Sequence, residues 1–401
     1  MGFESGRVFI RIKNFSVSIM KKVFVVLFIA LFSILLGCAS KTSDSSGTQT
    51  RIFTDSAGRE VEIPVVITSV APTGPLSQVV LYMACPDMLA GISMDFPENA
   101  KGFIPEKYYS LQKFGQFYGR NASLNMEALI AAAPDVIIDV GEAKEHIAQD
   151  MDNLQKQLGI PVVFVEATLE TIEKSFLMLG DLTGDKERAD RLGEYCRSTI
   201  EHADSSRQFL HDNEKVRVYM ATGQNGLNTN AKDSFHADVL RKVGAENVVD
   251  IESSTLGAGS EVSFEQILIW NPQVILVDSA LLYEKLNSDP IWRQVEAIQT
   301  GRVYKIPAIP YSFITNPPAA NRIIGIRWLG WLLYTEQYKI NIEDEVRFFF
   351  KEFYSIDLSE EQYQQIMLYA LLGNASYASM GGAKHRCDAV ALWARIDISH
   401  A

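Results

Sequence analysis

Two stretches of this sequence follow one plan: NMEALIAAAPDVII at residues 125–138 and SFEQILIWNPQVIL at residues 263–276. Each has a polar residue that can cap a helix, a glutamate in the first turn, a short amphipathic helix, a proline stop and an apolar strand. Apolar strands without alternation are typical of parallel sheets covered on both faces. The repeat therefore predicts two equivalent lobes, with a ligand site between them at the carboxyl ends of the strands.

The same alternation of strands and helices extends to both sides of the repeat. The predicted fold class is α/β: two Rossmann-like lobes joined by one long bridging helix, with a ligand cleft between the lobes. That helix is expected at residues 185–210, and its 26 residues would span about 39 Å, too long for a simple crossover. A hairpin is expected at 52–63. Further strands are expected at 67–71, 88–93, 136–140, 161–166, 216–221, 274–278 and 303–307, and further helices at 76–83, 125–133, 146–158, 171–182, 237–243, 264–270, 291–298, 321–334 and 344–354.

The start of the chain has the pattern of an export signal. Residues 20–38 read MKKVFVVLFIALFSILLGC, in which two lysines precede a 14-residue apolar run that is too short to cross a bilayer. Met20 is the expected start. The ending in glycine and cysteine resembles the lipobox of prokaryotic lipoproteins, which implies that Cys38 is lipidated. An ordinary signal peptide or a short anchor that contains a cysteine is the alternative.

These features divide the chain into six segments. The Ser/Thr-rich stretch after Cys38 has no hydrophobic period and is typical of a flexible tether. The protein is thus expected at the cell envelope, in the periplasm or at the outer face of the cytoplasmic membrane. The expected boundaries are 1–37 for the signal peptide, 38–50 for the tether, 51–183 for the first lobe, 184–213 for the bridging helix, 214–357 for the second lobe and 358–401 for a C-terminal extension, of which the last part, 375–401, is a candidate for disorder.

Charge and cysteine usage exclude several classes of partner. The net charge is −12, and residues 1–37 contribute +4, so the exported part carries −16. An acidic surface argues against nucleic acid and against an anionic membrane face as partners. Besides Cys38, the cysteines are Cys85, Cys196 and Cys387, without CxxC spacing, so no pairing is deduced. Cys85 and Cys196 are expected to be small buried apolar residues.

No motif for catalysis or for a bare metal ion is present. The sequence lacks G-x-S-x-G, H-E-x-x-H and a P-loop, so we expect neither enzyme activity nor a cofactor. The six histidines are widely spread, which disfavours a naked transition metal as ligand. A bare oxyanion such as molybdate, held by backbone amides, stays open.

Several further segments carry a resemblance to a known family. They are LGDLTG at 179–184, DPIW at 289–292, GRVY at 301–304 and NPPAANR at 316–322 followed by Trp328-Leu329. With the lipobox and the repeat, residues 51–357 resemble the substrate-binding lipoproteins of ABC importers for iron-siderophores, haem and vitamin B12. The last segment resembles a metal-chelate or haem subgroup. The resemblance implies a monomer that hands a metal chelate to an ABC permease and its ATPase. A sensory or adaptor lipoprotein of the same fold is the alternative.

The resemblance also assigns roles to residues. Glu127 and Glu265 match the family's two docking glutamates, although helix-start glutamates are also favoured by the helix dipole alone. Ligand candidates follow from the loops at strand ends, where aromatic rings offer stacking area and polar groups fix anions or carbonyls. Phe114, Phe117 and Phe313 could equally be core. The ligand candidates are Met94, Asp95, Tyr118, Arg120, Glu142, Asn225, Tyr311, Phe313 and Asn316.

Overall fold

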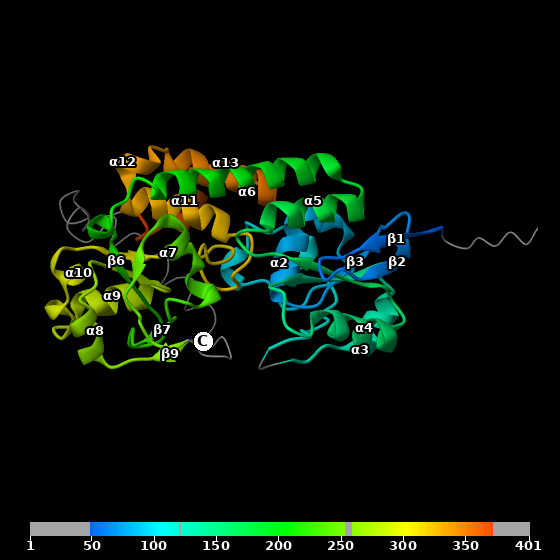
Figure 1. Ribbon diagram of the computed structural model, residues 1–401, viewed down its shortest axis with the longest axis horizontal. Coiled ribbons are helices and arrows are strands. Elements are labelled where there is room, and N and C mark those ends of the chain that lie inside the picture. Colours follow the sequence, from blue (N-terminus) through cyan, green and yellow to red (C-terminus); the bar gives the residue numbers. More distant parts are fainter. Residues whose placement is uncertain (1–48, 120–121, 253–258, 372–401) are drawn as a thin grey trace, which may run out of the picture. The chain divides into compact units, whose positions relative to one another are not determined.

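The computed structural model describes residues 49–119, 122–252 and 259–371 (Figure 1). Cys38, Arg120 and Cys387 therefore lie outside the described residues, as do the signal and most of the tether. Two parallel sheets with helices around them and one long helix between them in the chain confirm the expected α/β class. None of the helices in the described ranges is long and apolar enough to cross a membrane.

The first lobe is built on a three-stranded parallel sheet of order β3-β4-β5. An antiparallel hairpin precedes it, as its sequence predicts. The strands are β1 (Thr50–Thr54), β2 (Glu60–Pro64), β3 (Val70–Pro72), β4 (Val136–Gly141) and β5 (Val162–Glu166). The helices are α2 (Pro75–Ala84), α3 (Met126–Ala132), α4 (Ile147–Leu158) and α5 (Ile172–Thr183), with 3-10 turns η1 (Pro86–Met88), η2 (Glu98–Ala100) and η3 (Glu106–Tyr108).

The expected strand at 88–93 is wrong. Only two isolated bridges form there, from Leu89 to Val70 and from Ile92 to Lys113. Gly91 lies between them, and a Cβ on it would clash with the Phe114 ring. A neighbouring loop therefore lies very close to this segment at Gly91. The apolar residues of the segment face the core, but its backbone forms no continuous ladder of hydrogen bonds.

The bridging helix is α6 (Lys186–Arg207), four residues shorter than the sequence predicts. The Asp185 side chain caps it by accepting a hydrogen bond from the Arg188 amide at 3.1 Å. Its 22 residues span about 33 Å. Helices from the end of the chain pack along it and on the first lobe, since α11 (Arg322–Leu333) contacts α6 and α13 (Ile342–Tyr354) contacts both α2 and α6.

The second lobe has a four-stranded parallel sheet of order β11-β10-β6-β8. Its strands are β6 (Arg217–Ala221), β8 (Glu246–Asn247), β10 (Val274–Val277) and β11 (Val303–Lys305), and β7 (Asn228–Thr229) pairs with β9 (Ser260–Glu261). The helices are α7 (Asp238–Val243), α8 (Phe264–Trp270), α9 (Ala280–Ser288), α10 (Glu296–Gln299), α11 (Arg322–Leu333), α12 (Thr335–Tyr338), α13 (Ile342–Tyr354) and α14 (Glu360–Met367), with 3-10 turns η4 (Asp212–Glu214), η5 (Phe235–Ala237) and η6 (Trp292–Gln294).

Two predicted features of this lobe differ from the structure. The helix expected at 291–298 is divided into η6 and α10, because Val295 between them is extended. The described part of the presumed extension, 358–371, packs on the lobe. The Trp328 indole donates to the Ala370 carbonyl at 3.0 Å, and the Lys305 amide donates to the Tyr369 carbonyl at 2.9 Å.

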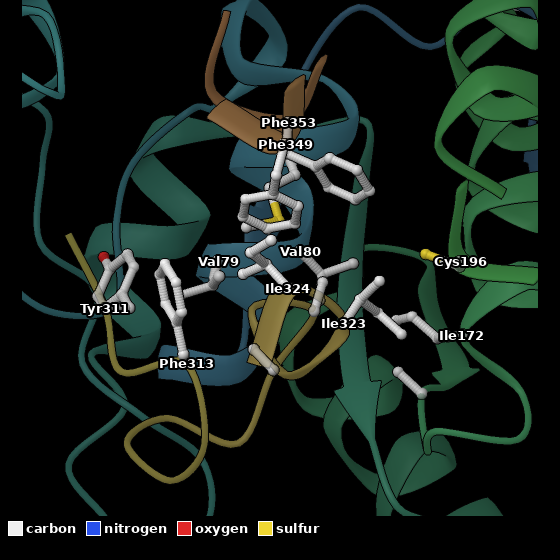
Figure 2. Close-up of a cluster of buried hydrophobic side chains, with 14 of the residues drawn as sticks. Val79, Val80, Ile172, Cys196, Tyr311, Phe313, Ile323, Ile324, Phe349 and Phe353 are labelled. Carbon is white, nitrogen blue, oxygen red and sulfur yellow. The ribbon is translucent and has the colours of Figure 1, made fainter. Parts of the chain in front are cut away.

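The largest apolar core is shared by helices that are far apart in sequence (Figure 2). Val79 and Val80 of α2 belong to the same buried cluster as Ile323 and Ile324 of α11, and Phe349 of α13 joins them. Cys196 of α6 is fully buried, and Cys85 is 6% exposed. Both thiols are free, and burial raises the pKa of Cys85 to about 12, which confirms their expected role as buried apolar residues.

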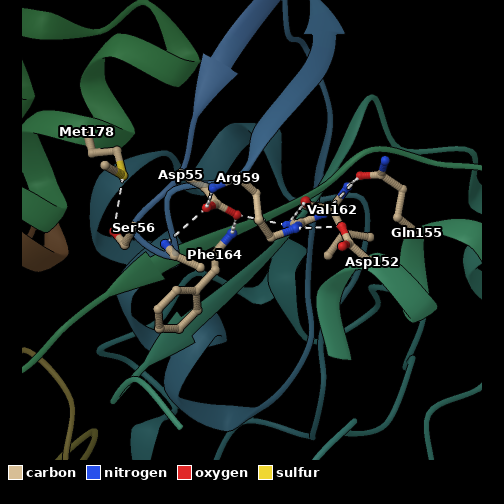
Figure 3. A network of polar contacts seen from close by, with 9 residues as sticks. Asp55, Ser56, Arg59, Asp152, Gln155, Val162, Phe164 and Met178 are labelled. Atoms are coloured by element: carbon tan, nitrogen blue, oxygen red, sulfur yellow. Dashed lines mark hydrogen bonds and ion pairs between the residues drawn. The ribbon is translucent and has the colours of Figure 1, made fainter. Parts of the chain in front are cut away.

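A buried ion pair fastens the hairpin to the first sheet (Figure 3). The Arg59 guanidinium donates from Nη1 to Asp55 Oδ2 at 2.8 Å and to the Val162 carbonyl at 2.9 Å. Asp55 also accepts from the Phe164 amide, and Arg59 reaches Asp152 on α4. Since both charges find several partners, this pair meets the condition under which a buried ion pair is tolerated.

Candidate functional site

Helices α3 and α8 begin in the same way. The Asn125 side chain accepts a hydrogen bond from the Ala128 amide at 2.9 Å, and the Ser263 hydroxyl accepts one from the Gln266 amide at 3.2 Å. Each helix has seven residues. The caps satisfy amides that a helix start otherwise leaves without acceptors, which fixes where each helix begins.

The two helices also end in the same way. Ala133 and Asn271 adopt the left-handed conformation, with φ of 46° and 44°, and their amides donate to carbonyls four residues back. Proline follows each of them, and the chain then enters β4 or β10, both central strands of their sheets. The repeated sequence thus forms the same structural unit in each lobe.

Glu127 and Glu265 occupy the same position in these units. Both side chains lie in the first helical turn and are exposed. Within the described ranges neither carboxylate has an ion pair. An exposed aliphatic residue lies one turn further on, Ile130 in α3 and Ile269 in α8, with 51% and 75% of its surface exposed. Each lobe therefore presents a free carboxylate beside an apolar side chain.

At the carboxyl end of the first sheet, Asp139 of β4 is buried. Thr73 donates a short hydrogen bond to its Oδ1, and the Thr73 hydroxyl lies 3.1 Å from that of Ser77. Ser77 in turn accepts from the Val140 amide at 2.8 Å. Burial raises the pKa of Asp139, and the hydrogen bond from Thr73 opposes the rise. This network holds the start of α2 against the end of β4.

Tyr118 lies beside helix α4. Its hydroxyl donates to Asp150 Oδ2 at 2.9 Å, and the Lys144 ammonium lies 2.9 Å from its ring centroid. Burial raises the pKa of the Tyr118 phenol. Glu142 follows β4 and is exposed, so the loop after β4 brings a carboxylate and the Lys144 cation to the neighbourhood of the Tyr118 ring.

Met94 and Asp95 are placed by Gln78 of α2. The fully buried Gln78 side chain accepts hydrogen bonds through Oε1 from the amides of Ser93 and Met94, at 2.7 and 3.0 Å. Met94 is 43% exposed, and the exposed Asp95 pairs with Lys113 at 2.5 Å.

In the second lobe the candidates divide into exposed and buried residues. Asn225 and Asn316 are exposed, and Asn225 Oδ1 accepts from Lys285 at 2.5 Å. Tyr311 is only 5% exposed, and its hydroxyl lies 3.5 Å from Gln78 Nε2 of the first lobe. Phe313 is fully buried in the shared core.

The aromatic residues that sequence reasoning left between core and site are now placed. Phe114 and Phe313 belong to the core, whereas Phe117 is half-buried and packs edge-on against Tyr118 at a ring distance of 4.7 Å. Tyr311 is buried with its hydroxyl beside Gln78, because the chain after β11 turns in towards α2. Its contact with a ligand stays a prediction. The structure brings Tyr118 and Glu142 to one sheet end.

Sequence reasoning missed several buried polar groups near these loops. Asp139, Gln78 and Arg322 were not among the candidates, although all three are less than 7% exposed. One signal was available: Arg322 begins a strongly apolar helix in which Arg327 is the only other charged residue. A charged side chain on a buried helix indicates a specific partner. Among the described residues, no three His, Cys, Asp or Glu side chains gather in a way that could hold a metal ion.

The fold and these sites can be compared with known proteins. Residues 106–310 match the periplasmic binding protein family. The vitamin B12-binding protein of Salmonella typhi is 30% identical over 209 residues, covering 50% of this chain and 69% of that protein. The molybdate-binding protein MolA of Haemophilus influenzae is 23% identical over 360 residues, covering 81% of this chain and 96% of that protein.

A solved structure gives the same result. An ABC transporter solute-binding protein from Sulfurospirillum deleyianum superimposes with a TM-score of 0.73 at 27% identity, covering 79% of this chain and 98% of that one. The chain belongs to the periplasmic binding protein family. Its class is that of the extracytoplasmic solute-binding proteins of ABC transporters, as its sequence led us to expect.

Proposed function

We propose that this protein is anchored by a lipid on Cys38, captures a metal chelate between its lobes, and delivers it to the permease and ATPase of an ABC importer. The observation that carries the proposal is the pair of exposed carboxylates, Glu127 and Glu265, on equivalent helices of the two lobes. A receptor with two basic pockets could hold one carboxylate of each lobe and so sense both lobes together.

The chelate is supported by the residues at the strand ends and by one relative. Tyr118 and Phe117 offer aromatic surface beside the carboxyl end of β4. The vitamin B12-binding relative takes a ligand of this class, as its name states. Iron-siderophore, haem and corrinoid are the chelates we propose. Met94, Asp95, Arg120, Glu142, Asn225 and Asn316 are the remaining proposed contacts.

Closure on the ligand is expected to be modest. Helix α6 is continuous over 22 residues, and α13 packs against both α2 of the first lobe and α6. A rigid connection of this kind resists the large hinge motions that flexible linkers permit.

An oxyanion such as molybdate or tungstate is the second candidate ligand. It is favoured by the similarity to MolA, which extends over 96% of that protein, although at only 23% identity.

Calorimetry on the purified mature chain distinguishes these candidates. Ferric siderophores, haem, cobalamin and molybdate are titrated separately, and we expect one chelate to bind with a stoichiometry of one. Arg120→Ala is expected to weaken that binding about tenfold, as the loss of a charge-assisted hydrogen bond would. The exposed Arg293, replaced by alanine, is the matched control. If only molybdate binds, the proposed ligand is the oxyanion and not the chelate. If none of the four ligands binds, both proposals are contradicted.

A further inference from the structure

Arg322, the first residue of α11, is a buried cation that lacks most of its partners. Its side chain is 2% exposed. Only Nη1 reaches acceptors, the Phe235 carbonyl and Asp238 Oδ2, both at 3.4 Å. Nε is buried and has no hydrogen-bond partner. A guanidinium has five N–H donors, and buried donors are nearly always satisfied in folded proteins.

Arg327 on the same helix shows how a structural arginine is held. It is 8% exposed, and all three of its nitrogens donate: Nε to Thr199 at 2.9 Å, Nη1 to Glu345 at 3.1 Å and Nη2 to Ser198 at 3.3 Å. Both arginines also lie over an aromatic ring. The two residues share helix, burial and stacking, so the difference between them is the set of acceptors.

The free part of Arg322 is the edge that recognises planar anions. Its Cζ lies 4.1 Å from the centroid of the Phe235 ring, so that ring covers one face of the guanidinium. Nε and Nη2 share one edge of the group, and no hydrogen bond from either is found in the described part of the chain. An edge of this kind binds two oxygens of a carboxylate, phosphate or similar oxyanion at once.

The charges around Arg322 compensate it only in part. Its one ion-pair partner, Asp238, is shared with Arg241, which binds the other oxygen at 2.6 Å. Glu170 and Glu142 also favour its charged form, but neither forms an ion pair with it among the described residues. Burial lowers the pKa of Arg322 to about 10, so the group is still protonated at neutral pH.

Arg322 also lies next to loops that follow strands. It ends the loop after β11, and in that loop the Thr315 carbonyl is 3.2 Å from Nδ1 of His236, the neighbour of Phe235. Glu142, which follows β4 in the other lobe, is near enough to influence the pKa of Arg322. The position is that of a ligand-binding residue between loops of both lobes.

We infer that Arg322 binds an anionic group of the transported solute, namely two oxygens of a carboxylate, a phosphate or a tetrahedral oxyanion, through Nε and Nη2. The inference rests on the proposed function in that a solute must bind between the lobes. It adds that this solute carries a negative oxygen group, as a haem propionate, a carboxylate siderophore, a corrinoid phosphodiester or molybdate does.

Arg322→Met and Arg327→Met separate a binding role from a structural one. Melting temperature is measured for the mature chain and both variants, alone and with inorganic phosphate, molybdate, ferric citrate, haem or cobalamin, and calorimetry follows on each probe that stabilises the wild-type protein. Arg322→Met is expected to keep or raise the melting temperature, because a buried charge with few partners is removed and Asp238 keeps its ion pair with Arg241. Its affinity for the anionic probe should fall by about thirtyfold or more, since two charged hydrogen bonds are lost.

Two control variants are expected to behave differently from Arg322→Met. Arg327→Met should lower the melting temperature and leave the affinity within about threefold, because its partners are internal. Arg322→Lys keeps the charge without the planar edge and should bind between wild type and Arg322→Met. The probe whose affinity depends on Arg322 identifies the source of the anionic oxygens.

Two results would overturn the inference. One is a loss of stability in Arg322→Met as large as that in Arg327→Met, with affinity unchanged. The other is a wild-type protein that no anionic probe stabilises. Failure of the chelates alone, with phosphate or molybdate still stabilising through Arg322, would contradict the proposed chelate and leave Arg322 as an anion site.

Discussion

Ala133 and Asn271 hold the same left-handed conformation at the ends of two helices that lie 138 positions apart in the chain, with φ of 46° and 44°. Asparagine tolerates this conformation well, whereas alanine is strained by its Cβ. The two lobes therefore share a local geometry that only one of them accommodates with a suitable residue.

The first prediction concerns this strain. Ala133→Gly should raise the free energy of unfolding by roughly 0.5 kcal/mol, since relief of the left-handed strain exceeds the entropy cost of glycine. Ala131→Gly, inside the same helix, should instead lower it by about 0.5–1 kcal/mol. Urea unfolding measures both, and equal destabilisation by the two glycines would contradict the geometry at Ala133.

The second prediction concerns the ion pair between the hairpin and the sheet. Asp55→Ala should destabilise the protein by about 3–5 kcal/mol, because Arg59 would remain buried without its carboxylate. The exposed pair of Lys351 and Asp357 provides the control, and Asp357→Ala should cost less than about 1 kcal/mol. Thermal unfolding compares the two variants, and similar losses would show that Asp55 is not in a buried pair.

Lys305 gives a prediction about pH. It is 9% exposed at the end of β11, and burial lowers its pKa to about 8. An unfolded lysine has a pKa of about 10.4, so between these values the unfolded chain binds more protons and the wild-type protein gains stability as pH rises. Lys305→Met should thus be more stable than wild type at pH 7, and its advantage should shrink towards pH 10.

The control for this prediction is Lys156→Met, which removes an exposed lysine of α4 and should change stability little, because exposed charges contribute little. Melting temperatures of the wild-type protein and both variants, measured from pH 7 to 10, test the prediction. If the stability advantage of Lys305→Met stays constant from pH 7 to 10, burial does not lower the pKa of this amine.

The anchoring proposal has its own test. Cys38→Ala should abolish labelling by a fatty-acid analogue in a bacterial host and release the protein from the membrane fraction, because the modified thiol is gone. Cys85→Ala should keep the label, since that thiol is buried in the folded lobe. Mass spectrometry of the wild-type protein without an acyl group would refute lipid anchoring.

Helices and strands were predicted closely where the local sequence determines both their buried residues and the positions at which they begin and end. Helix α8 spans the expected residues 264–270, since Ser263 caps it and Pro272 follows it. The central strands β4 and β10 could be assigned directly, because β10 is wholly apolar and β4 is apolar but for Asp139 and its last residue, Gly141. Helix α9 was not expected, although Leu282, Tyr283 and Leu286 form its buried face.

The candidate site was predicted less well than the fold. Loops at strand ends could be located, but the side chains that face a ligand depend on contacts from distant segments. Tyr311 is buried because Gln78 of α2 meets it, 233 positions away in the chain. Arg322 became informative only when its missing acceptors were compared with the satisfied Arg327. No local pattern encodes either relationship.

Glu127 and Glu265 carry the central claim, that this protein serves an ABC permease through one carboxylate on each lobe. The most direct measurement is the ATPase rate of the partner ABC permease complex in liposomes, with the solute-loaded protein added. Glu127→Arg combined with Glu265→Arg should abolish the stimulation while solute affinity and melting temperature stay unchanged, because exposed charges add little to stability.

The matched control reverses Glu106 and Glu336, which also lie in the first turns of short helices, one in each lobe, and are exposed. The account predicts full stimulation by this control and none by the double variant of Glu127 and Glu265. Equal stimulation by both double variants would contradict the account. Loss of solute binding in the Glu127 and Glu265 double variant would contradict it as well.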